Sequence, residues 1–383
     1  MNWVTVKLGE LYEVHNGLSK GRGFFGSGYP FLTFSTVFDN YFLPNKLDAL
    51  VQSTVAEREN YSIQRGDVFV TRTSETSDEL GMSCVALKDY PNATYNGFTK
   101  RMRPFTDRVL PEFIGYYMRM PSFRREFQAF STMTTRASLK NEDLLGLKIW
   151  LPEKDIQKKI ANILSTYDKL IENNQKQIKL LEEAAQRLYK EWFIDFRFPG
   201  YENKIKINNI PTDWIKTTVG NLVPVLTGKK DANYGTEDGD YPFFTCSKEP
   251  IKSPTFSFDT NAVILAGNGD FSVKLYRGKF EAYQRTYVLS PYELKHLYLV
   301  YFSIKESLNK LFKGASGSTI KFLTKKMIEE IEVLMPPDNN LNMYNKNMDS
   351  IQTKIEVLKS YIQFAVEARE RLLPKLMSGD IEV

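Results

Sequence analysis

The sequence predicts an α+β protein made by internal duplication, with two tandem β-rich domains alternating with two long helices. Residues 3–11, WVTVKLGEL, align without a gap to residues 214–222, WIKTTVGNL, and residues 29–35, YPFLTFS, recur as residues 241–247, YPFFTCS. Each half then closes with an apolar segment that ends in proline and is followed by a long helical pattern. A fixed order of repeated segments indicates a duplicated architecture.

The length of the chain allows two or three domains, each large enough to bury a core. It has 383 residues, of which 42% are hydrophobic and 13% aromatic, so we expect a folded globular protein. We divide it into a first β-rich domain, a central helix, a linker rich in Pro, Gly and Asn, a second β-rich domain and a C-terminal helix. These five segments span residues 1–152, 153–196, 197–211, 212–337 and 338–383.

Matching strand-like runs occur inside both β-rich domains. GDVFVTRTSE from Gly66 corresponds to NAVILAGNGD from Asn261, and LKIWLP at residues 147–152 corresponds to IEVLMP at residues 331–336. Short apolar runs and alternating apolar residues of this kind are typical of buried or half-buried strands. We therefore expect the two domains to share one fold, related by a pseudo-two-fold repeat.

The central segment has the apolar spacing of a helix that packs along one seam. The steps between seam residues alternate between three and four, with one extra residue in the middle, and no Gly or Pro interrupts them. The seam positions are Ile156, Ile160, Ile163, Tyr167, Leu170, Asn174, Ile178, Leu181, Ala185, Leu188 and Trp192. At about 1.5 Å per residue, this helix would be roughly 55 Å long.

The C-terminal segment repeats this design, and we expect it to pair with the central helix as an antiparallel coiled coil. A long helix with a narrow apolar stripe needs a partner, and the other long helix is the obvious one. The alternative is two separate helices, each packed on its own domain. The seam positions of this segment are Met348, Ile351, Ile355, Leu358, Ile362, Ala365 and Leu372, and Pro374 and Gly379 mark its end.

Motifs of catalysis and of metal binding are missing, so we predict no catalytic residue and no metal site. Residues 21–26 satisfy the GxGxxG pattern, but Ser27, Gly28 and Pro30 follow where a dinucleotide site would need a helix. The two histidines and two cysteines have no metal-ligand spacing. No apolar run is long enough for a spanning helix and no signal peptide is recognisable, so we expect a cytoplasmic protein without a membrane partner.

Overall charge does not identify a partner, because 51 basic residues only slightly exceed 46 acidic ones. The loops of the β-rich domains nevertheless combine cations, hydroxyls and amides, which hold phosphates and read base edges in DNA. The candidates are Ser19, Lys20, Arg22, Arg72, Thr73, Ser74, Lys100, Arg101, Arg103 and Arg136 in the first domain, and Lys229, Lys230, Ser247, Lys248, Asn268, Lys274, Arg277, Gln284 and Arg285 in the second. For each of them a solvated surface position is the competing interpretation.

The segment NGFTKRMR, residues 96–103, is the densest of these clusters. It places three cations beside aromatic and sulfur side chains, without an acidic residue. The competing interpretation here is a basic edge strand that protects the domain from aggregation.

Two motifs carry a family resemblance. They are PEKDIQKKIANILSTYDKLIENNQKQIKLLEEAAQRLYKEWFIDFRFPG at residues 152–200 and ERLLPKLMSGDIEV at residues 370–383. With these motifs the whole chain resembles the specificity subunit of type I restriction-modification systems. That family often has Gln just after its Pro motif, as Gln157 is here. The second half reads PPDNNLNMYNKNM instead, so we expect its helix to start later or to fray.

The resemblance implies a non-catalytic chain that binds double-stranded DNA and gives a complex its sequence preference. Each β-rich domain would be a target-recognition domain for one half of a split site. The two helices would set the gap between the halves and dock two modification subunits, and two restriction subunits would complete the complex. S-adenosylmethionine, ATP and Mg would be bound by those partners and not by this chain.

Two other interpretations of the residues remain open. One is a coiled-coil scaffold whose β-rich units bind proteins rather than DNA. The other is a chain that is itself a methyltransferase, for which the sequence shows no cofactor pocket.

Overall fold

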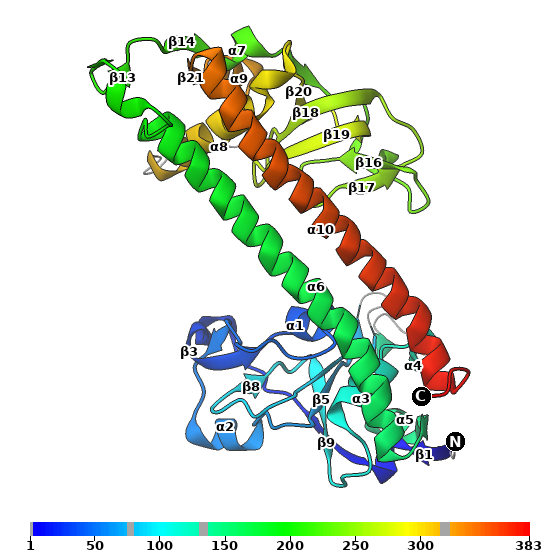
Figure 1. Cartoon of the computed structure of the whole chain (residues 1–383). Helices are drawn as coiled ribbons and strands as arrows, with labels where there is room; N and C mark the ends of the chain where they lie inside the picture. Colours follow the sequence, from blue (N-terminus) through cyan, green and yellow to red (C-terminus); the bar gives the residue numbers. More distant parts are fainter. Residues whose placement is uncertain (1–2, 75–79, 130–136, 315–321) are drawn as a thin grey trace. The chain divides into compact units, whose positions relative to one another are not determined.

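The computed structural model divides into two compact units, each containing one β-rich domain and parts of both long helices (Figure 1). It describes residues 3–74, 80–129, 137–314 and 322–383. The first unit consists of Met1–Gln175 and Ser360–Val383, and the second of Lys176–Lys359. Both units combine helices with sheets, so the predicted α+β class is confirmed.

Short strands and helices make up the first unit before α6, the long central helix of Lys154–Tyr189. The strands are β1 (Val4–Lys7), β2 (Tyr12–Asn16), β3 (Phe25–Leu32), β4 (Leu50–Val51), β5 (Val68–Thr71), β6 (Thr73–Ser74), β7 (Ser83–Val85), β8 (Thr94–Tyr95), β9 (Thr99–Pro104), β10 (Ala137–Ser138) and β11 (Lys148–Leu151). The helices are η1 (Leu8–Glu10), η2 (Arg22–Phe24), α1 (Phe34–Asp39), α2 (Val55–Asn60), α3 (Pro111–Tyr117), α4 (Pro121–Ala129) and α5 (Asn141–Gly146).

The second unit has a similar series of elements between the end of α6 and α10, the long helix of Asp338–Ser378. The strands are β12 (Lys206–Ile207), β13 (Ile210–Pro211), β14 (Ile215–Thr218), β15 (Val225–Thr227), β16 (Tyr241–Phe244), β17 (Ile251–Ser253), β18 (Phe258–Ala266), β19 (Val273–Ala282), β20 (Thr286–Leu289) and β21 (Glu332–Met335). The helices are η4 (Lys190–Ile194), η5 (Tyr201–Asn203), α7 (Val219–Leu222), η6 (Ala232–Tyr234), η7 (Leu294–His296), α8 (Leu297–Gly314) and α9 (Lys325–Glu329).

The sheets of the two units follow one plan. The first unit has a four-stranded sheet of order β2-β9-β5-β7 and a three-stranded sheet of order β4-β3-β8. The second unit joins the equivalent strands into one six-stranded sheet of order β15-β20-β18-β19-β16-β17. The ten-residue strand β19 makes this difference, because it occupies the places of both β7 and β8.

The repeated sequence segments occupy equivalent places in these sheets. Strand β1 pairs antiparallel with β11, with Val4 opposite Leu151, and β14 pairs antiparallel with β21, with Ile215 opposite Met335. The first and last segments of each β-rich domain therefore close on each other at the start of a long helix. The duplication predicted from the sequence is confirmed at the level of strand pairing.

The two YPF segments have the same role in their units. Leu32 of β3 pairs in parallel with Tyr95 of β8, and Phe244 of β16 pairs in parallel with Ala282 of β19. The Thr and Ser that follow also repeat one contact: the hydroxyl oxygens of Thr33 and Ser35 are 3.0 Å apart, and those of Thr245 and Ser247 are 2.7 Å apart. These segments are framework elements of both domains.

The long helices run antiparallel within each unit (Figure 1). In the first unit, Ile160 and Leu164 near the start of α6 share a core with Leu373 and Leu376 near the end of α10. In the second unit, the rings of Trp192, directly after α6, and Tyr344, near the start of α10, have centroids 5.8 Å apart. Paired helices are therefore found, rather than separate helices that pack only on their own domains.

The seam of α6 differs from the prediction at Leu170, and it passes through Leu164 more deeply than through Ile163. Leu170 is 44% exposed, whereas its neighbour Ile171 is half-buried and Leu164 is fully buried. With Leu164 in place of Ile163 and Ile171 in place of Leu170, the steps from Ile160 to Trp192 alternate strictly between four and three, and the extra residue lies at the start of the helix, between Ile156 and Leu164. The predicted extra residue in the middle is therefore wrong, and it arose because two adjacent apolar residues offered a choice that the spacing alone did not decide.

The remaining predicted seam residues are buried or half-buried. They are Ile156, Ile160, Ile163, Tyr167, Asn174, Ile178, Leu181, Ala185, Leu188 and Trp192 on the central helix, and Met348, Ile351, Ile355, Leu358, Ile362, Ala365 and Leu372 on α10.

The start of α10 corrects one expectation, and its end confirms Gly379, but not Pro374, as the mark of the helix end. The helix begins at Asp338, directly after Pro337, and the main-chain N–H of Leu341 donates to the Pro337 carbonyl at 3.1 Å. It therefore neither starts late nor frays. It also continues through Pro374 to Ser378 and stops before Gly379, whose φ of 79° lies in the left-handed region that favours glycine.

The segment predicted as a linker is packed against the second unit. Phe198 is 1% exposed, and its ring centroid lies 5.4 Å from that of Trp214. Phe196 approaches the same indole at 5.3 Å. Aromatic burial of this kind fixes the chain at the end of α6 instead of leaving it free.

Candidate nucleic-acid interface

A cavity in the second unit collects three of the predicted DNA-binding residues. It has a volume of about 490 Å³ and lies where β18 ends and β20 begins. Asn268, Gln284 and Arg285 line it together with Gly267, Tyr287, Phe322 and Leu323. These side chains supply amides, a guanidinium and aromatic rings at one place.

Main-chain hydrogen bonds hold the turn that carries Arg285. The N–H of Thr286 donates to the Tyr283 carbonyl at 2.8 Å, and the N–H of Gly267 donates to the Arg285 carbonyl at 2.9 Å. The N–H of Leu323 in turn donates to the Gly267 carbonyl at 2.8 Å. The backbone of Arg285 is therefore fixed between two neighbouring segments while its side chain is exposed.

The first unit contains the same turn. The N–H of Thr99 donates to the Asn96 carbonyl at 3.0 Å, and the N–H of Arg72 donates to the Phe98 carbonyl at 3.0 Å. The N–H of Leu139 donates to the Arg72 carbonyl at 3.0 Å. Phe98 therefore occupies the position of Arg285, and Arg72 that of Gly267. We call these two turns, residues 96–99 and 283–286, the paired turns.

The chemistry of the cavity suits contact with nucleic acid bases. The guanidinium of Arg285 has no hydrogen bond or ion pair to the residues that the structure describes, and Phe322 is 63% exposed. Arginine binds the O6 and N7 acceptors of guanine bidentately, and asparagine or glutamine pairs with adenine. Aromatic rings can stack on bases.

Two more cations of the second unit are exposed at its surface. Lys229 and Lys248 have no side-chain partner within the described part of the chain, and both positions suit phosphate contacts. Lys230 lies over the ring of Tyr234, with its Nζ 4.1 Å from the centroid. Ser247 donates from its Oγ to the Glu249 carbonyl at 2.7 Å, so this hydroxyl is engaged within its loop.

Lys274 and Arg277 have internal roles. Lys274 donates to the carbonyl of Ser247 at 2.9 Å, and burial lowers the pKa of its ammonium group. Arg277 donates to Asp349 Oδ1 of α10 at 2.9 Å, and the hydroxyl of Tyr298 donates to the same oxygen at 2.7 Å. Arg277 therefore ties β19 to the helix, and we no longer assign it to the interface.

The dense basic segment of the first unit is also engaged internally. Arg103 binds Asp67 with two hydrogen bonds, of 2.8 and 2.7 Å, and the Asp67 side chain is fully buried. Arg101 is 3% exposed and donates to the Ser62 carbonyl at 2.9 Å. These guanidinium groups satisfy acceptors between strand β9 and neighbouring loops, so they are not available to DNA in this structure.

Lys100 is withdrawn from the surface in the same way. It is 5% exposed and donates to Asn141 Oδ1, and its pKa is lowered by burial and then by the nearby charge of Arg72. The competing edge-strand interpretation is also wrong, because β9 lies inside the sheet between β2 and β5. The cations of residues 100–103 thus hold the domain together.

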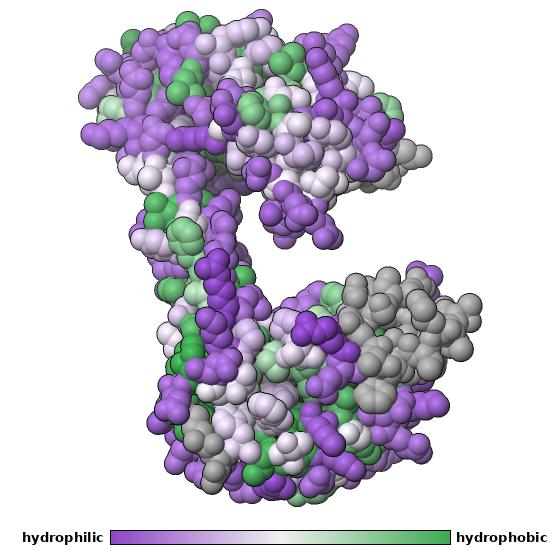
Figure 2. Space-filling model, turned by 90° about the vertical axis from the view of Figure 1, so that its right-hand side faces the viewer, coloured by the Kyte–Doolittle hydropathy of each residue, from purple (hydrophilic) through white to green (hydrophobic). Residues whose placement is uncertain are grey.

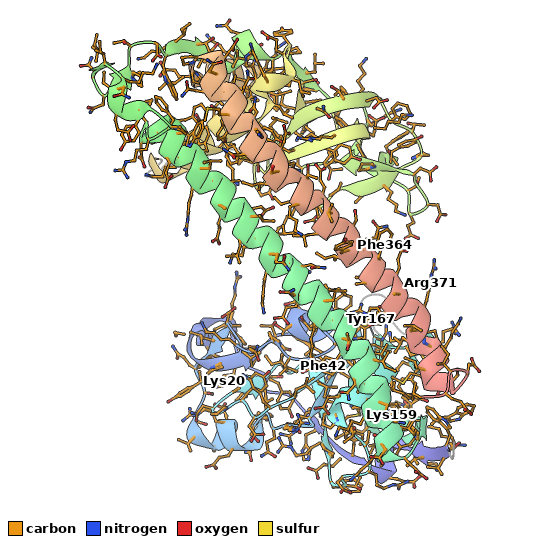
Figure 3. The ribbon with its side chains drawn as sticks, in the orientation of Figure 1. Lys20, Phe42, Lys159, Tyr167, Phe364 and Arg371 are labelled. Atoms are coloured by element: carbon orange, nitrogen blue, oxygen red, sulfur yellow. The ribbon has the colours of Figure 1, made fainter. Side chains whose placement is uncertain are left out.

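The other first-unit candidates are distributed over three places. Ser19 is exposed in a loop and Arg22 is exposed at the start of η2, while Lys20, labelled in Figure 3, binds Glu57 at 2.7 Å. Arg72 is half-buried beside Phe98, without a side-chain partner among the described residues. Thr73 and Ser74 form β6, which pairs with β10, but their side chains lie outside the described ones, and Arg136 lies outside the described residues altogether.

Sequence reasoning missed the importance of three aromatic residues. Phe98, 59% exposed, lies within the first of the paired turns, and Tyr287 and Phe322 line the cavity beside the second. The available signal was the position of Phe98 in NGFTKRMR, an aromatic side chain in the turn directly before the strand that begins at Thr99.

No cluster of potential metal ligands and no membrane-crossing helix occurs in the described ranges. A family model for the type I restriction modification DNA specificity domain, by contrast, matches residues 1–183 and 211–372. The chain belongs to this family. DNA-sequence recognition in a restriction-modification system is the general role of the family, and its members are generally non-catalytic.

Relatives of known name are consistent with this membership. The EcoDI specificity subunit of Escherichia coli is 37% identical over 176 residues, covering 45% of this chain and 39% of that protein. The MjaIX specificity subunit of Methanocaldococcus jannaschii is 24% identical over 418 residues, covering 100% of this chain and 94% of that protein.

A solved structure shares the fold. The crystal structure of a type I restriction-modification system S subunit from M. genitalium has a TM-score of 0.56 and 15% sequence identity, and the match covers 98% of this chain and 96% of that one. At this identity the likeness establishes the architecture of two tandem domains and long helices, and not the contacts that each domain makes.

Proposed function

We propose that this chain gives a type I restriction-modification complex its sequence preference, with each unit reading one half of a bipartite DNA target. The paired turns carry this proposal. One backbone arrangement occurs in both units, and it presents chemically different side chains at the same position, Phe98 in one and Arg285 in the other. A duplicated frame with different exposed residues suits two different half-sites.

Phosphate contacts would orient each unit on the duplex. Arg22, Lys229 and Lys248 are exposed cations without side-chain partners in the described parts of the chain. Contacts of this type fix register without carrying sequence information, whereas the paired turns would supply base contacts. The two roles can be separated by experiment.

The helices would set the gap between half-sites and dock two modification subunits. Their surfaces carry exposed apolar side chains, namely Leu170, Tyr361 and Phe364 in the first unit and Leu180, Met343 and Val357 in the second. Figure 2 shows hydrophobic patches on the helices among hydrophilic ones, and Figure 3 shows Phe364 on α10 and Tyr167 on α6. Exposed apolar groups on a helix favour a protein partner.

The chemistry of the complex would belong to its other subunits. The modification subunits would bind S-adenosylmethionine and methylate adenine, and two restriction subunits would use ATP and Mg. This chain would bind none of these cofactors. In this assignment it selects the DNA sequence on which the partners act.

The dependence of DNA affinity on salt tests the binding role. In the assembled complex, replacing Lys229 and Lys248 with Ala should make the logarithmic salt slope shallower by about one for each lysine–phosphate pair that the substitutions remove. Lys346→Ala on α10, also an exposed lysine without a side-chain partner among the described residues, is the matched control and should leave the slope unchanged. An unchanged slope in the double variant would favour a scaffold that binds proteins.

A further inference from the structure

The position shared by Phe98 and Arg285 is rigid in both units but differs in chemistry. Each residue accepts a main-chain hydrogen bond on its carbonyl, from Arg72 in the first unit and from Gly267 in the second. Each is followed by a Thr that closes the turn and begins a central strand. A fixed backbone with an exposed side chain is what direct readout requires, because little conformational freedom is lost on binding.

Arg285 has the properties of a base-reading residue. It is exposed, it lines the 490 Å³ cavity beside Asn268 and Gln284, and its guanidinium contacts no acidic group in the part of the chain that the structure describes. By contrast, Arg101, Arg103 and Arg277 are all engaged with carbonyl or carboxylate oxygens. Arg285 is therefore available to the two acceptors of a guanine.

Phe98 is exposed even though its turn is pinned on both sides. Its N–H donates to Asn96 Oδ1 at 2.7 Å, and its side chain is 59% exposed. The adjacent Gly97 lies so close to Ser19 that a Cβ there would be 2.2 Å from the serine Oγ. The loop is therefore packed underneath the turn, and the phenyl ring projects from a supported surface.

The equivalence of the turns indicates how Phe98 meets DNA. If Arg285 enters the major groove to reach guanine, a residue at the same place in the same frame enters that groove in the other half-site. The apolar feature of the major groove is the C5-methyl group of thymine. An exposed phenyl ring suits contact with that methyl group.

We propose that Arg285 and Phe98 are equivalent specificity-determining residues, Arg285 for a guanine in one half-site and Phe98 for the methyl group of a thymine in the other. The inference rests on the proposed function and goes one step further, since it names the residue and the base for each unit. Positions 98 and 285 are thus equivalent sites in the two units, and they would recognise different bases.

The decisive experiment exchanges the two side chains in the full chain assembled with its modification subunits. Sequencing of methylated DNA should show that Arg285→Phe removes a guanine preference of about 10- to 100-fold at one position of one half-site. Phe98→Arg should change the preferred base from thymine to guanine at one position of the other half-site. Lys248→Phe, which also replaces an exposed cation, should weaken methylation of all sequences equally and leave the motif unchanged.

A base analogue tests the methyl contact directly. Deoxyuridine in place of the thymine removes only the methyl group, so the binding of the unsubstituted chain should weaken about fourfold. The Phe98→Arg variant should be insensitive to that replacement. Both residues are exposed, so folding is not expected to change, and unchanged thermal midpoints would verify this.

Three results would overturn the inference. One is an unchanged methylation motif in both variants, and another is an equal loss for all sequences, which would indicate phosphate contacts. The third is that deoxyuridine changes the binding of the unsubstituted chain and of the Phe98→Arg variant equally, or changes neither. That result would fit a phenyl ring that wedges between base steps. If replacing a whole recognition domain changes one half-site while these variants do not, the inference fails and the proposed function stands.

Discussion

Gln157 links the first β-rich domain to the start of α6. Its side chain is fully buried, its Oε1 accepts from the N–H of Leu110 at 2.8 Å, and its Nε2 donates to the carbonyls of Arg108 and Pro152 at 2.9 and 2.8 Å. The second unit makes a related contact one turn later, where Asn345 Nδ2 donates to the Lys295 carbonyl at 2.7 Å. The family motif therefore has a structural basis even where the residue differs.

Replacing Gln157 with Leu should destabilise the first unit by about 2 kcal/mol, because it leaves one N–H and two carbonyls without a partner in a buried place. The midpoint of thermal unfolding, measured by calorimetry on the full chain, should fall. Gln175→Leu on the same helix is the control, since Gln175 is exposed and should change stability by less than about 0.5 kcal/mol. Equal effects of both substitutions would contradict this role.

The two cysteines offer a probe of DNA contact in the second unit. Cys246 is partly exposed, and its Sγ lies 3.6 Å from the Arg285 carbonyl, whereas Cys84 is fully buried and burial raises its pKa to about 12. At pH 8 the native chain should therefore show one reactive thiol. In the assembled complex, saturating duplex DNA should slow the alkylation of Cys246, measured by mass spectrometry.

High salt, which weakens DNA binding, should restore the alkylation rate of Cys246. Alkylation of Cys246 at the same rate with and without DNA would show that the interface lies elsewhere.

The raised pKa of Cys84 also affects the pH dependence of stability. Because the pKa of this thiol in the folded state lies above its value in the unfolded state, near 8.5, the neutral thiol favours the folded state below that pH. This contribution to the free energy of unfolding is lost as the pH rises toward 12.

Charged residues show most clearly what the sequence could and could not predict at this scale. Arg101, Arg103 and Arg277 look like Arg285 in the sequence, yet they bind Ser62, Asp67 and Asp349 respectively. Those partners lie between 36 and 72 residues away in the chain, so only the fold reveals them. The internal repeat, in contrast, consists of short segments that can be compared directly in the sequence.

Arg101→Ala should consequently act on stability and not on DNA binding. It removes a buried guanidinium and leaves the Ser62 carbonyl without this donor, so unfolding should become easier by roughly 1–3 kcal/mol. The salt slope of DNA affinity in the folded complex should stay unchanged. A shallower salt slope with unaltered stability would indicate that Arg101 contacts DNA phosphates.

At the scale of elements, each unit is attached to the helices by an arginine, an aspartate and a tyrosine. In the first unit Asp168 of α6 accepts from Arg369 of α10 and from the hydroxyl of Tyr116 in α3. In the second unit Asp349 of α10 accepts from Arg277 of β19 and from Tyr298 of α8. Each cluster therefore joins its domain to the helix pair through one carboxylate.

Arg369→Met should loosen this attachment in the first unit. Arg369 and Asp168 are 14% and 28% exposed, so the destabilisation should be smaller than for a fully buried pair, about 1–2 kcal/mol. Hydrogen exchange should become faster in α3 and in the end of α10. Arg371→Met on the same helix is exposed and serves as the matched control. Unchanged exchange in the Arg369 variant would show that the ion pair does not hold these elements.

The presence of the long helices was predictable from the sequence, but their buried face and their ends were not. The long helices follow from uninterrupted apolar spacing, whereas the choice between Leu170 and Ile171 depended on which side of α6 is packed. Likewise, of the two predicted end signals of α10, Gly379 follows the helix directly, whereas Pro374 stands inside its last turns. Local signals set the type of an element, and packing decides its exact face and end.

At the scale of the whole molecule, the duplication is the property from which the function follows. Each compact unit contains one β-rich domain and a part of each long helix, so neither helix belongs to one unit alone. If the two units read independent halves of one DNA target, as proposed, a change confined to one domain alters only one half-site.

Replacing residues 1–150 with the matching domain of another family member tests whether the two units read their half-sites independently. The hybrid chain, assembled with the modification subunits, should direct methylation to a sequence with one half changed, while the other half and the gap are kept. Sequencing of methylated adenines in treated DNA reads all three features at once. If the hybrid complex methylates a target with both halves changed, or methylates the original target, the two units do not read their half-sites independently.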